Sequence, residues 1–483
     1  MSVKKGLEEL RAVRLRKRDA LLAGGQQPYP DRFSPTHACA NGADGDSVRV
    51  CGRLMSLRDM GKTIFGHLQD DSGRVQLMLR KNEFGDEPYA RFRDVVDIGD
   101  ILGCEGRVMY TRSNERTVQA SDVIVLAKSL LPLPDKFHGL TDDETRFGQR
   151  YLEIITDRDV RERFRTRSRV IRLIRGYLDE RGFEEVDTPL LQAIPSGAQA
   201  APFETHHRAS GRTLYLRIAP ETYLKRLIVA GYDKVYEIGR NFRNEGMDRS
   251  HLQEFTMLEY YCAWWNMWDN VRFIREMLQH LIHEVCGSLA VPLSGLTLDF
   301  SGEWPTVEYR DLVLQDCGID VLAYDDVDAL RAEIARRGIA HPAHFVGGLG
   351  TVIDKLYKLV SRPKLVQPTF LVHHPAALSP LARPNDKDPR VVDQFQLLVN
   401  GWEIVKAYSE LVDPILQRAR LEEQARAKED GDEEAMSLDE PYLQAMEYGM
   451  PPNSGLGLGV DRLVALLTGQ TTLKEAVIFP IGT

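Results

Sequence analysis

The stretch that most constrains this chain is residues 235–265, which read VYEIGRNFRNEGMDRSHLQEFTMLEYYCAWW. Successive side chains of a strand point to opposite faces, so the odd-numbered residues from Val235 to Arg243 share one face. A polar segment with a turn-forming glycine and aspartate follows. On the return run, the odd-numbered residues from Phe255 to Tyr261 again share a face. The pattern predicts an antiparallel hairpin with arginines, carboxylates and a histidine around its mouth.

The charged residues at this mouth suit charged ligands. Arg243 carries five forked donors, which fit a carboxylate or a phosphate held in two directions at once. The carboxylates of Glu245 and Glu259 suit an ammonium group or a magnesium ion. Taken alone, these charges are equally compatible with a surface hairpin that carries ordinary ion pairs. The remaining motifs of the chain decide between the two interpretations.

Composition places the chain among ordinary globular proteins. Its 483 residues suffice for two or three domains, and 43% are hydrophobic and 28% charged. No apolar run reaches the length of a membrane span, and the N-terminus lacks the apolar core of a secretion signal. The six cysteines are scattered without a CxxC pair, which favours a reducing cytosol over a disulfide framework or a zinc site. The net charge of −9 argues against indiscriminate nucleic-acid binding, but a local basic face is still compatible with RNA.

Residues 4–22 are expected to form a basic amphipathic helix. Its apolar positions are Leu7, Leu10, Val13 and Leu21. Its seven lysines and arginines make it a candidate phosphate-backbone contact, and a solvated helix packed by its leucines is the alternative.

Short alternating runs separated by turn residues predict five strands between residues 47 and 128. The runs are 48–58, 63–70, 73–80, 100–112 and 116–128. Five such strands suit a small Greek-key barrel of the OB type, whose sheet face binds single-stranded nucleic acid by stacking. Phe65 fits either a stacking platform of this kind or the core of the barrel.

After the barrel, the sequence pattern predicts a linker, a helix and a strand in turn, followed by a region of alternating helices and strands. Residues 129–150 are polar and contain prolines, as expected of an interdomain linker. Apolar residues at helical spacing predict a helix at 157–180, and a strand follows at 183–191. Region 287–394 alternates helices with short strands and reads as an insertion, with His373 and His374 as structural residues. The charged segment 422–434 is expected to be a solvated helix or loop.

Two later motifs carry further chemistry. In the predicted strand at 399–413, Glu403 could bind magnesium, while Tyr408 and Glu410 share one face. Residues 450–467, MPPNSGLGLGVDRLVALL, form a glycine-rich strand that feeds a helix with Arg462 near its start.

Together these motifs resemble those of the class II aminoacyl-tRNA synthetases. The order FRNEG, His251, EFTMLE resembles motif 2, in the wording of the lysyl-tRNA synthetases, and GLGLGVDR resembles motif 3. The stretch GKTIFGHLQDDSGRVQL looks like the anticodon-binding barrel of the same family. The resemblance implies an α+β fold with an N-terminal OB barrel and a catalytic antiparallel sheet flanked by helices. The expected divisions are 1–46 (basic helix and connector), 47–128 (anticodon-binding domain), 129–150 (linker) and 151–483 (catalytic domain, with the insertion around 287–394).

The same resemblance implies an activity and its partners. The expected reaction is ATP-dependent attachment of L-lysine to tRNA(Lys) through lysyl-adenylate, with Mg²⁺, in a cytoplasmic homodimer built on the helix–strand pair after residue 157. The residues matched to ATP binding are Arg243, Glu245, His251, Phe255, Glu403 and Arg462, of which Arg243 and Arg462 are catalytic and Glu403 holds the metal. Those matched to lysine are Gly197, Glu221, Arg243, Glu259, Tyr261, Tyr408 and Glu410. Those matched to the anticodon are Phe65, Gln76 and Glu115.

Three positions depart from the family pattern. Lys406 stands where many members have asparagine, Gln396 where many have a glutamate that shares magnesium with Glu403, and Ala201 where an arginine is common. The departure at Gln396 leaves the number of magnesium ions open, and that at Lys406 leaves open whether this residue contacts substrate. An aspartyl- or asparaginyl-type synthetase on the same fold and a non-catalytic RNA-binding paralog are the alternatives.

Overall fold

The computed structural model describes residues 2–134, 142–246, 248–339, 345–429, 431 and 434–481. The chain falls into two compact units, Met1–Thr141 and Asp142–Thr483. Residues 135–141, which belong to the expected linker, lie outside the described residues, as do three positions of the charged segment 422–434. Among the helices of the described residues, none has the length and apolar character needed to cross a membrane. All six cysteines are free thiols.

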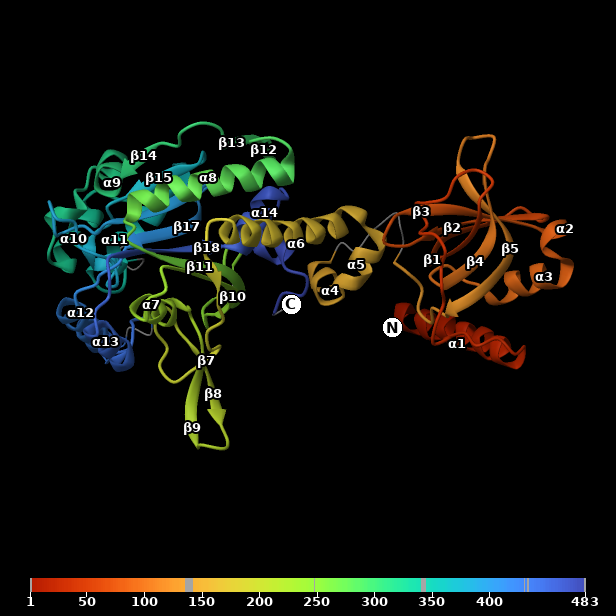
Figure 1. Ribbon diagram of the computed structural model, residues 1–483, viewed down its shortest axis with the longest axis horizontal. Coiled ribbons are helices and arrows are strands. Elements are labelled where there is room, and N and C mark those ends of the chain that lie inside the picture. Colours follow the sequence, from red (N-terminus) through yellow and green to blue (C-terminus); the bar gives the residue numbers. More distant parts are fainter. Residues whose placement is uncertain are drawn as a thin grey trace. The chain divides into compact units, whose positions relative to one another are not determined.

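The first unit contains a closed five-stranded barrel, as the strand pattern predicts (Figure 1). Its strands, in their order around the barrel, are β1 (Ser47–Asp59), β2 (Thr63–Gln69), β3 (Arg74–Arg80), β5 (Arg116–Ala127) and β4 (Ile101–Tyr110). All neighbours are antiparallel except β3 and β5, which run parallel. Two helices that the pattern did not predict, α2 (Lys81–Phe84) and α3 (Asp86–Val95), connect β3 to β4 and bury Phe84, Tyr89 and Phe92.

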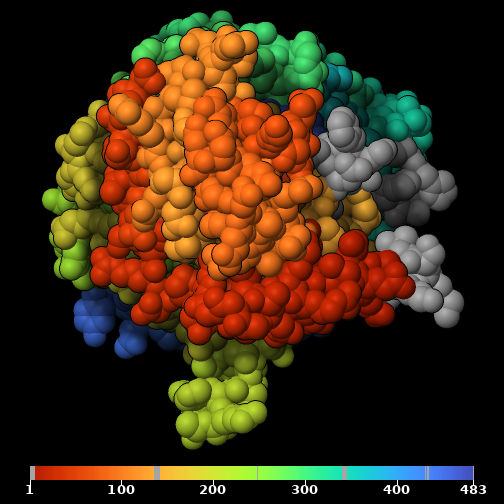
Figure 2. All heavy atoms as spheres, turned by 90° about the vertical axis from the view of Figure 1, so that its right-hand side faces the viewer, coloured from red at the N-terminus to blue at the C-terminus, as the bar shows by residue number. Residues whose placement is uncertain are grey.

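The N-terminal helix α1 (Ser2–Ala23) is present, but its packing differs from the expectation. Leu21 is buried, whereas Leu7, Leu10 and Val13 are exposed, so the leucines do not form one packing face. Arg14 fixes the helix instead, because its guanidinium donates hydrogen bonds to three backbone carbonyls of the same unit, at 3.0 Å each. Figure 2 shows α1 in red along one edge of this unit, below the orange barrel segments.

The second unit is built on an eight-stranded, mostly antiparallel sheet in the described residues. Its strands, in their order across the sheet, are β14 (Thr306–Glu308), β15 (Thr369–Val372), β16 (Gln394–Val399), β17 (Trp402–Ser409), β18 (Asn453–Gly459), β11 (Glu254–Ala263), β10 (Lys234–Phe242) and β6 (Glu184–Glu185). Only β14–β15 and β10–β6 run parallel. With the barrel of the first unit, this sheet and its helices confirm the expected α+β fold.

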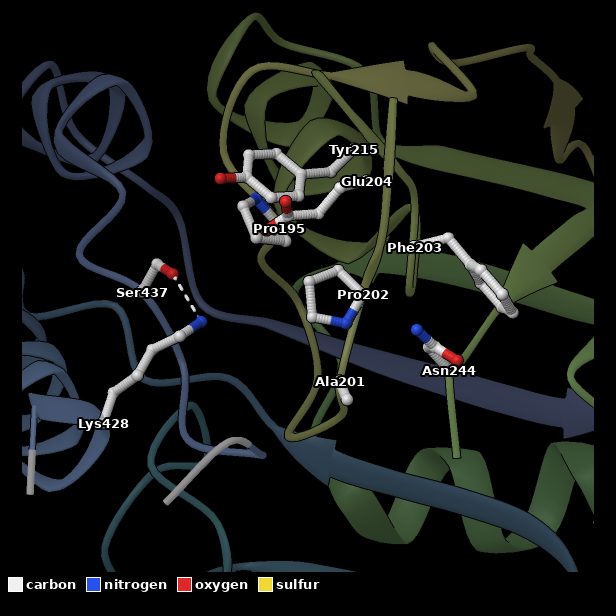
Figure 3. A pocket seen from close by; sticks show the side chains of 9 residues that line it. All are labelled: Pro195, Ala201, Pro202, Phe203, Glu204, Tyr215, Asn244, Lys428 and Ser437. Atoms are coloured by element: carbon white, nitrogen blue, oxygen red, sulfur yellow. Dashed lines mark hydrogen bonds between the residues drawn. The ribbon is translucent and has the colours of Figure 1, made fainter. Parts of the chain in front are cut away.

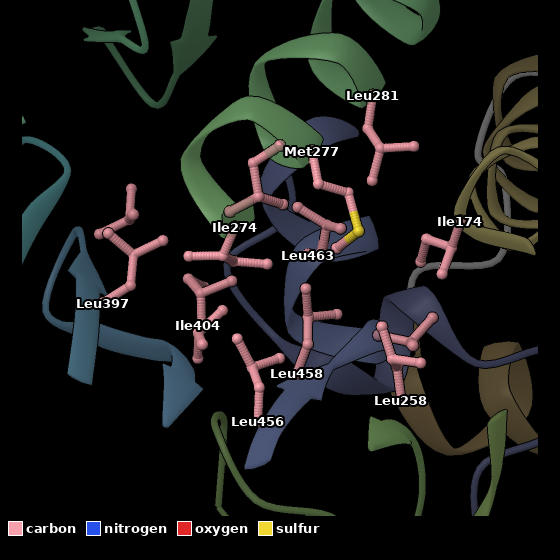
Figure 4. Packing of buried hydrophobic residues seen from close by; sticks show 14 of the residues in the cluster. Ile174, Leu258, Ile274, Met277, Leu281, Leu397, Ile404, Leu456, Leu458 and Leu463 are labelled. Atoms are coloured by element: carbon pink, nitrogen blue, oxygen red, sulfur yellow. The ribbon is translucent and has the colours of Figure 1, made fainter. Parts of the chain in front are cut away.

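One face of the sheet is covered by α6 (Arg158–Asp179), α8 (Met267–Cys286) and α14 (Val460–Leu467). Strand alternation sends Leu258, Leu456 and Leu458 to this face, where they lie in the largest buried cluster. Figure 4 shows Ile274 and Met277 of α8 above the leucines of β18. Because alternate residues of the same strands are glycine, carboxylate or tyrosine, the opposite face is left polar.

That polar face is partly roofed by α7 (Glu221–Val229), which contacts β10, β11 and α13 (Glu440–Glu447). Leu224 and Ile228 of α7 pack on Val235 and Tyr261 of the sheet. On the far side, α13 and α12 (Pro414–Glu429) pack around Tyr408. Five of the residues matched to lysine are buried between the sheet and α7, and we call this group the slot: Glu221, Glu259, Tyr261, Tyr408 and Glu410.

The remaining elements surround this frame. They are α4 (Asp143–Gly148), α5 (Arg150–Thr156), the three-stranded sheet of β7 (Leu191–Gln192), β9 (Arg212–Leu216) and β8 (Phe203–His207), the hairpin of β12 (Ala290–Leu293) and β13 (Leu296–Asp299), and α9 (Tyr309–Cys317), α10 (Val327–Arg336) and α11 (Leu349–Val360). Short 3₁₀ turns lie at Val321–Ala323, Arg362–Lys364, Ala376–Leu378 and Leu473–Ala476. In Figure 1, β8 and β9 project from the rest of the second unit.

The structure differs from the sequence pattern at two boundaries. Residues 142–150 form α4 and the start of α5 within the second unit, where Arg150 is buried and pairs with Glu153 at 2.5 Å. The expected strand at 183–191 is divided into β6 and β7, which belong to different sheets and are separated by a proline-bearing segment. Within region 287–394, which is expected to be an insertion, β14 and β15 extend the main sheet.

Candidate active site

The hairpin of the opening motif forms in the expected register. Val235 faces Tyr261, Glu237 faces Glu259, and Asn241 faces Phe255. Directly opposite residues of antiparallel strands lie on the same face, so these side chains all lie on the polar face. The next strand, β18, adds Gly455, Gly457 and Gly459 to the same rows. The glycines let neighbouring side chains, such as Tyr261 and Glu410 beside Gly455, pack directly against the strand backbone.

Two of the predicted lysine-binding acids lie in one buried cluster. Glu221 begins α7, and Glu410 follows β17; both are buried. The hydroxyl of Tyr408 donates to Oε1 of Glu221 at 2.6 Å. Lys225, one turn along α7, forms an ion pair with the same Oε1 at 2.5 Å and a second ion pair with Oε2 of Glu410. The structure therefore brings Glu221, Tyr408 and Glu410 together around an ammonium group that the sequence analysis did not single out.

Glycines make this cluster possible. A Cβ on Gly455 would overlap the ring of Tyr261 and lie 2.5 Å from Oε1 of Glu410. Gly197 has φ +89°, a conformation that favours glycine, and a Cβ there would lie 3.0 Å from Cβ of Glu221. Gly197 therefore lets its backbone pass close to the start of α7, where the sequence analysis expected it to face the amino acid.

Glu259 is the third acid of the slot. It is buried, and the Tyr261 hydroxyl donates a hydrogen bond to its Oε2 at 3.5 Å. Its cross-strand neighbour Glu237 is neutralised by the buried Arg217, which pairs with Glu237 at 2.5 Å and also donates to a backbone carbonyl at 2.9 Å. Among the described residues, Glu259 is therefore the acid of this row that has no ion pair with an arginine or lysine.

Burial dominates the acid–base properties of the slot. Burial and the charge of Glu221 raise the pKa of Glu259 well above its ordinary value, although two arginines oppose the shift. Burial also raises the pKa of Glu410 to about 8, despite the lowering effect of Lys225. Burial alone would lower the pKa of Lys225, but Glu221 and Glu410 outweigh it and raise that pKa. An incoming cation would favour the ionised forms of both glutamates.

Arg243 directly follows β10. Its guanidinium carbon is 5.1 Å from the centre of the Phe255 ring. Its Nε is buried and has no hydrogen-bond partner among the described residues. A buried cationic donor without a partner is costly unless a ligand supplies the acceptor. Arg243 and Phe255 thus offer a charged donor and an aromatic face side by side.

The loop after Arg243 holds two further predicted residues. Nδ1 of His251 lies 2.8 Å from a carboxylate oxygen of Asp248. Partial burial opposes ionisation of Asp248, but hydrogen bonds from His251 and Ser250 lower its pKa to about 2. His251 is exposed, and Glu245 is half-buried with its backbone carbonyl accepting from Gln253 at 3.1 Å. Among the described residues, neither His251 nor Glu245 makes a side-chain hydrogen bond or ion pair with Arg243, so the structure does not join them to it.

Arg462 and Glu403 form the second charged group on this face. Arg462 donates to the backbone carbonyl of Glu403 at 2.7 Å, and the two side chains approach to 4.0 Å. The amide of Gln396 donates to Oε2 of Glu403, and Gln396 also lies opposite Lys406 in the sheet. Burial opposes ionisation of Glu403, but Arg462 and Lys406 outweigh it and hold its pKa below the ordinary value. Glu403 is therefore a carboxylate among cations.

This donor set limits how a magnesium ion could be held. No group of three or more histidine, cysteine, aspartate or glutamate side chains capable of holding a metal occurs within the described residues. Mg²⁺ is commonly held by one or two carboxylates together with substrate phosphates. Glu403 fits that second arrangement, with the amide of Gln396 in place of a second carboxylate. The residues therefore fit an ion that is shared with a nucleotide.

Sequence reasoning missed the residues that fix this geometry. Asp461 is buried in the first turn of α14, where it pairs with Arg167 of α6 at 2.5 Å and accepts from the backbone of Thr256 at 2.7 Å. Asp461 therefore connects α14, and with it Arg462, to both α6 and β11. Asp461 stood in the quoted motif, but a helix-start aspartate has a common local explanation. Lys225 gave no signal beyond its i, i+4 spacing from Glu221.

A separate pocket of about 760 Å³ adjoins the loop at Asn244 (Figure 3). Ala201 and Pro202 lie between Asn244 and the Lys428–Ser437 pair, which is joined by a hydrogen bond of 3.1 Å. The backbone N–H of Asn244 donates to the carbonyl of Ala201 at 2.8 Å. None of the residues matched to ATP or lysine is among the residues that line this pocket.

In the barrel unit, the anticodon candidates Gln76 and Glu115 lie in one outer network. Gln76 donates to Glu115 at 2.8 Å, and His67 lies 2.8 Å from the other oxygen of Glu115. Phe65 is two residues from His67 and therefore on the same face of β2, where it is half-buried while Ile64 is buried. Phe65 thus lies outside the barrel core.

Comparison with known proteins agrees with both units. Residues 142–483 match the family described as "tRNA synthetases class II (D, K and N)", and residues 48–126 match the "OB-fold nucleic acid binding domain". The chain is 43% identical to a lysine–tRNA ligase of Pelotomaculum thermopropionicum, over 98% of this chain and 95% of that protein. It is 44% identical to one from Roseiflexus castenholzii, over 98% of each, and 44% identical to one from Aquifex aeolicus, over 90% of this chain and 72% of that protein.

Proposed function

This chain belongs to the class II lysyl-tRNA synthetases, the lysine–tRNA ligases, and on that basis we propose roles for its site residues. It attaches lysine to tRNA at the expense of ATP, through the adenylate intermediate general to class II enzymes. The observation that carries the amino-acid assignment is the buried cluster of Glu221, Glu259 and Glu410 beside Tyr408. An acidic side chain, as in the aspartyl alternative, would meet three carboxylates there.

In the first step, the lysine carboxylate attacks the α-phosphorus of ATP and pyrophosphate leaves. Arg243 is assigned to the lysine carboxylate and the α-phosphate, because its buried Nε has no partner among the described residues. Phe255, under the Arg243 guanidinium, is assigned to adenine. Glu245 and His251 are assigned to ATP from the loop, and Arg462 to the γ-phosphate. Rate enhancement comes from positioning and charge neutralisation.

Lysine is held in the slot. Glu221, with Gly197 behind it, is assigned to the α-ammonium, and Tyr408, Glu410, Glu259 and Tyr261 to the side chain. Glu403 would hold Mg²⁺ together with the ATP phosphates, and a bound ion supplies positive charge to them. In the second step, the terminal adenosine hydroxyl of tRNA attacks the acyl carbon and AMP leaves. The anticodon is assigned to Phe65, Gln76 and Glu115, and a cytoplasmic homodimer is proposed as the working form.

Amino-acid-dependent ATP–pyrophosphate exchange tests this function, run with each of the twenty amino acids. Exchange with lysine alone is expected, because lysine carries two ammonium groups and a carboxylate that match the slot and Arg243. Exchange with a different amino acid would keep the class II chemistry and overturn the pocket assignment. Absence of exchange with all twenty, in folded protein with Mg²⁺, would favour the non-catalytic RNA-binding alternative.

Arg243→Ala tests the catalytic assignment. We expect lysine-dependent exchange to be abolished while tRNA binding, measured by filter retention, is unchanged. Arg240→Ala is the matched control, because Arg240 lies on the same strand and makes a 3.5 Å ion pair with Glu254 at a partly exposed position. Such pairs contribute about 0–1 kcal/mol to stability. Wild-type exchange rates in Arg243→Ala would refute the role.

A further inference from the structure

Lys225 is a buried ammonium inside the amino-acid slot. It has no exposed surface and lies one turn after Glu221 on α7. Its ammonium contacts Oε1 of Glu221 and Oε2 of Glu410. The ring centres of Tyr408, Tyr261 and Tyr442 lie 5.5, 5.8 and 5.8 Å from it. Because two carboxylates and three aromatic rings enclose its ammonium group, Lys225 is a fixed structural part of the slot.

The contacts divide the oxygens of the two acids. Lys225 and Tyr408 both use Oε1 of Glu221, while the ion pair to Glu410 uses Oε2. Oε1 of Glu410 is buried and accepts no hydrogen bond within the described residues. In Glu410, Oε2 is therefore held by Lys225, whereas Oε1 has no hydrogen-bond partner among the described residues.

The charges of the slot also balance a particular substrate. When ionised, Glu221, Glu259 and Glu410 contribute three negative charges, of which Lys225 cancels one. The nearby pair of Glu237 and Arg217 cancels itself. Two negative charges remain for the α- and ε-ammonium groups of lysine, whose carboxylate is assigned to Arg243. Buried charges are stable only when they are paired in this way.

We propose that Lys225 is a specificity-determining positioning residue, which holds one oxygen of both Glu221 and Glu410 and sets the slot charge to accept a substrate with two ammonium groups. The proposal rests on the function proposed above. Without Lys225, the slot would hold an uncompensated carboxylate, which would take up a proton instead of the substrate ammonium.

A pH dependence follows from the same contacts. The groups around Glu410 are Glu221 and Lys225 of α7, Tyr261 of β11, Tyr408 of β17 and Tyr442 of α13. With a pKa of about 8, Glu410 is protonated at low pH in the free protein and must ionise to bind an ammonium. Lysine binding should therefore strengthen as pH rises from 6 to 8. Removing Lys225 removes its lowering effect on the pKa of Glu410 and moves this rise to higher pH.

Lys225→Met tests the proposal in the full chain. The readouts are KM and kcat for lysine and for norleucine, which lacks the ε-ammonium, in pyrophosphate exchange between pH 6 and 8.5. We expect the preference for lysine over norleucine to fall by about tenfold or more at pH 7, because one buried carboxylate loses its partner charge. The change should appear mainly in the KM for lysine. Lys358→Met is the control, because Lys358 makes an i, i+4 ion pair with Asp354 at an exposed position.

An unchanged lysine preference together with an unshifted pH profile would overturn the proposal. Because Lys225→Met leaves a buried carboxylate, Lys225→Arg is measured as well; it keeps the positive charge beside Glu221 and Glu410. We expect Lys225→Arg to retain most of the preference for lysine over norleucine and the wild-type pH profile. A folded Lys225→Arg variant that loses this preference as fully as Lys225→Met would contradict the charge balance. Wild-type protein that activates no lysine would instead reject the proposed function itself.

Discussion

At the scale of single residues, the missing side chain of Gly455 shapes the slot. A Cβ there would overlap the ring of Tyr261 and press on Glu410. Gly455→Ala should therefore displace both groups and destabilise the second unit by about 1–3 kcal/mol, the usual cost of overpacking. Thermal unfolding should show a lowered Tm, and lysine KM in pyrophosphate exchange should rise.

Gly457→Ala provides the comparison on the same strand. Its Cβ would meet the sulfur of Met257 at 3.5 Å, an ordinary contact. Its Tm should equal or exceed that of the wild type, because alanine reduces the conformational freedom of the unfolded chain. If Gly455→Ala and Gly457→Ala lower the Tm by the same amount, close packing around Gly455 is not the cause of the destabilisation.

Individual site residues differed in how well the sequence predicted them. Strand alternation placed Glu259 and Tyr261 on one face, and the register of β10 and β11 confirmed it. Lys225 could not be predicted, because a lysine one turn after a glutamate is usually a solvated helix pair. What distinguishes it is its burial against Glu410, a contact between residues far apart in the sequence.

At the scale of elements, the placement of α14 depends on one buried ion pair. Asp461 joins Arg167 of α6 to the backbone of β11, and Arg462 follows it directly. Asp461→Asn keeps an acceptor for the Thr256 N–H but leaves Arg167 buried without a counter-charge, which costs about 3–5 kcal/mol. We expect a lower Tm and a raised KM for ATP, because α14 carries Arg462.

A double-mutant cycle with Arg167→Met checks the cause. Removing both charges leaves the Thr256 hydrogen bond in place, so the double variant should be more stable than the sum of the single losses predicts. Additive losses would mean that the two residues act independently of each other.

Elements were predicted well where the pattern was local and poorly where distant contacts decide. The hairpin of β10 and β11 and the helix α6 follow from periodicity alone. The segment at 183–191 reads as one strand, yet its two ends pair with different sheets. Likewise, the sequence pattern could not show that Arg14 fixes α1, because the backbone carbonyls that accept its hydrogen bonds lie far along the chain.

At the scale of the whole molecule, the chain consists of two compact units with separate cores, and each carries its own candidate site. The amino-acid slot is built entirely from elements of Asp142–Thr483, whereas Gln76 and Glu115 belong to Met1–Thr141. Pyrophosphate exchange needs no tRNA, so it reports on the second unit. Aminoacylation needs both units. Comparing the two assays therefore separates anticodon recognition from adenylate formation.

Glu115→Ala should affect only the assay that uses tRNA. Glu115 contacts both Gln76 and His67, so its removal breaks the outer network of the barrel without touching the barrel core. We expect the KM for tRNA(Lys) to rise about tenfold, within the ~1–3 kcal/mol that a good base-edge contact contributes, while lysine-dependent exchange stays at the wild-type rate. Glu105→Ala is the control, since Glu105 is an exposed barrel glutamate paired with Arg49 at 2.9 Å. Equal KM values for the two variants would show that the Glu115 network does not recognise the anticodon, and a fall in exchange would show that the variant acts through folding.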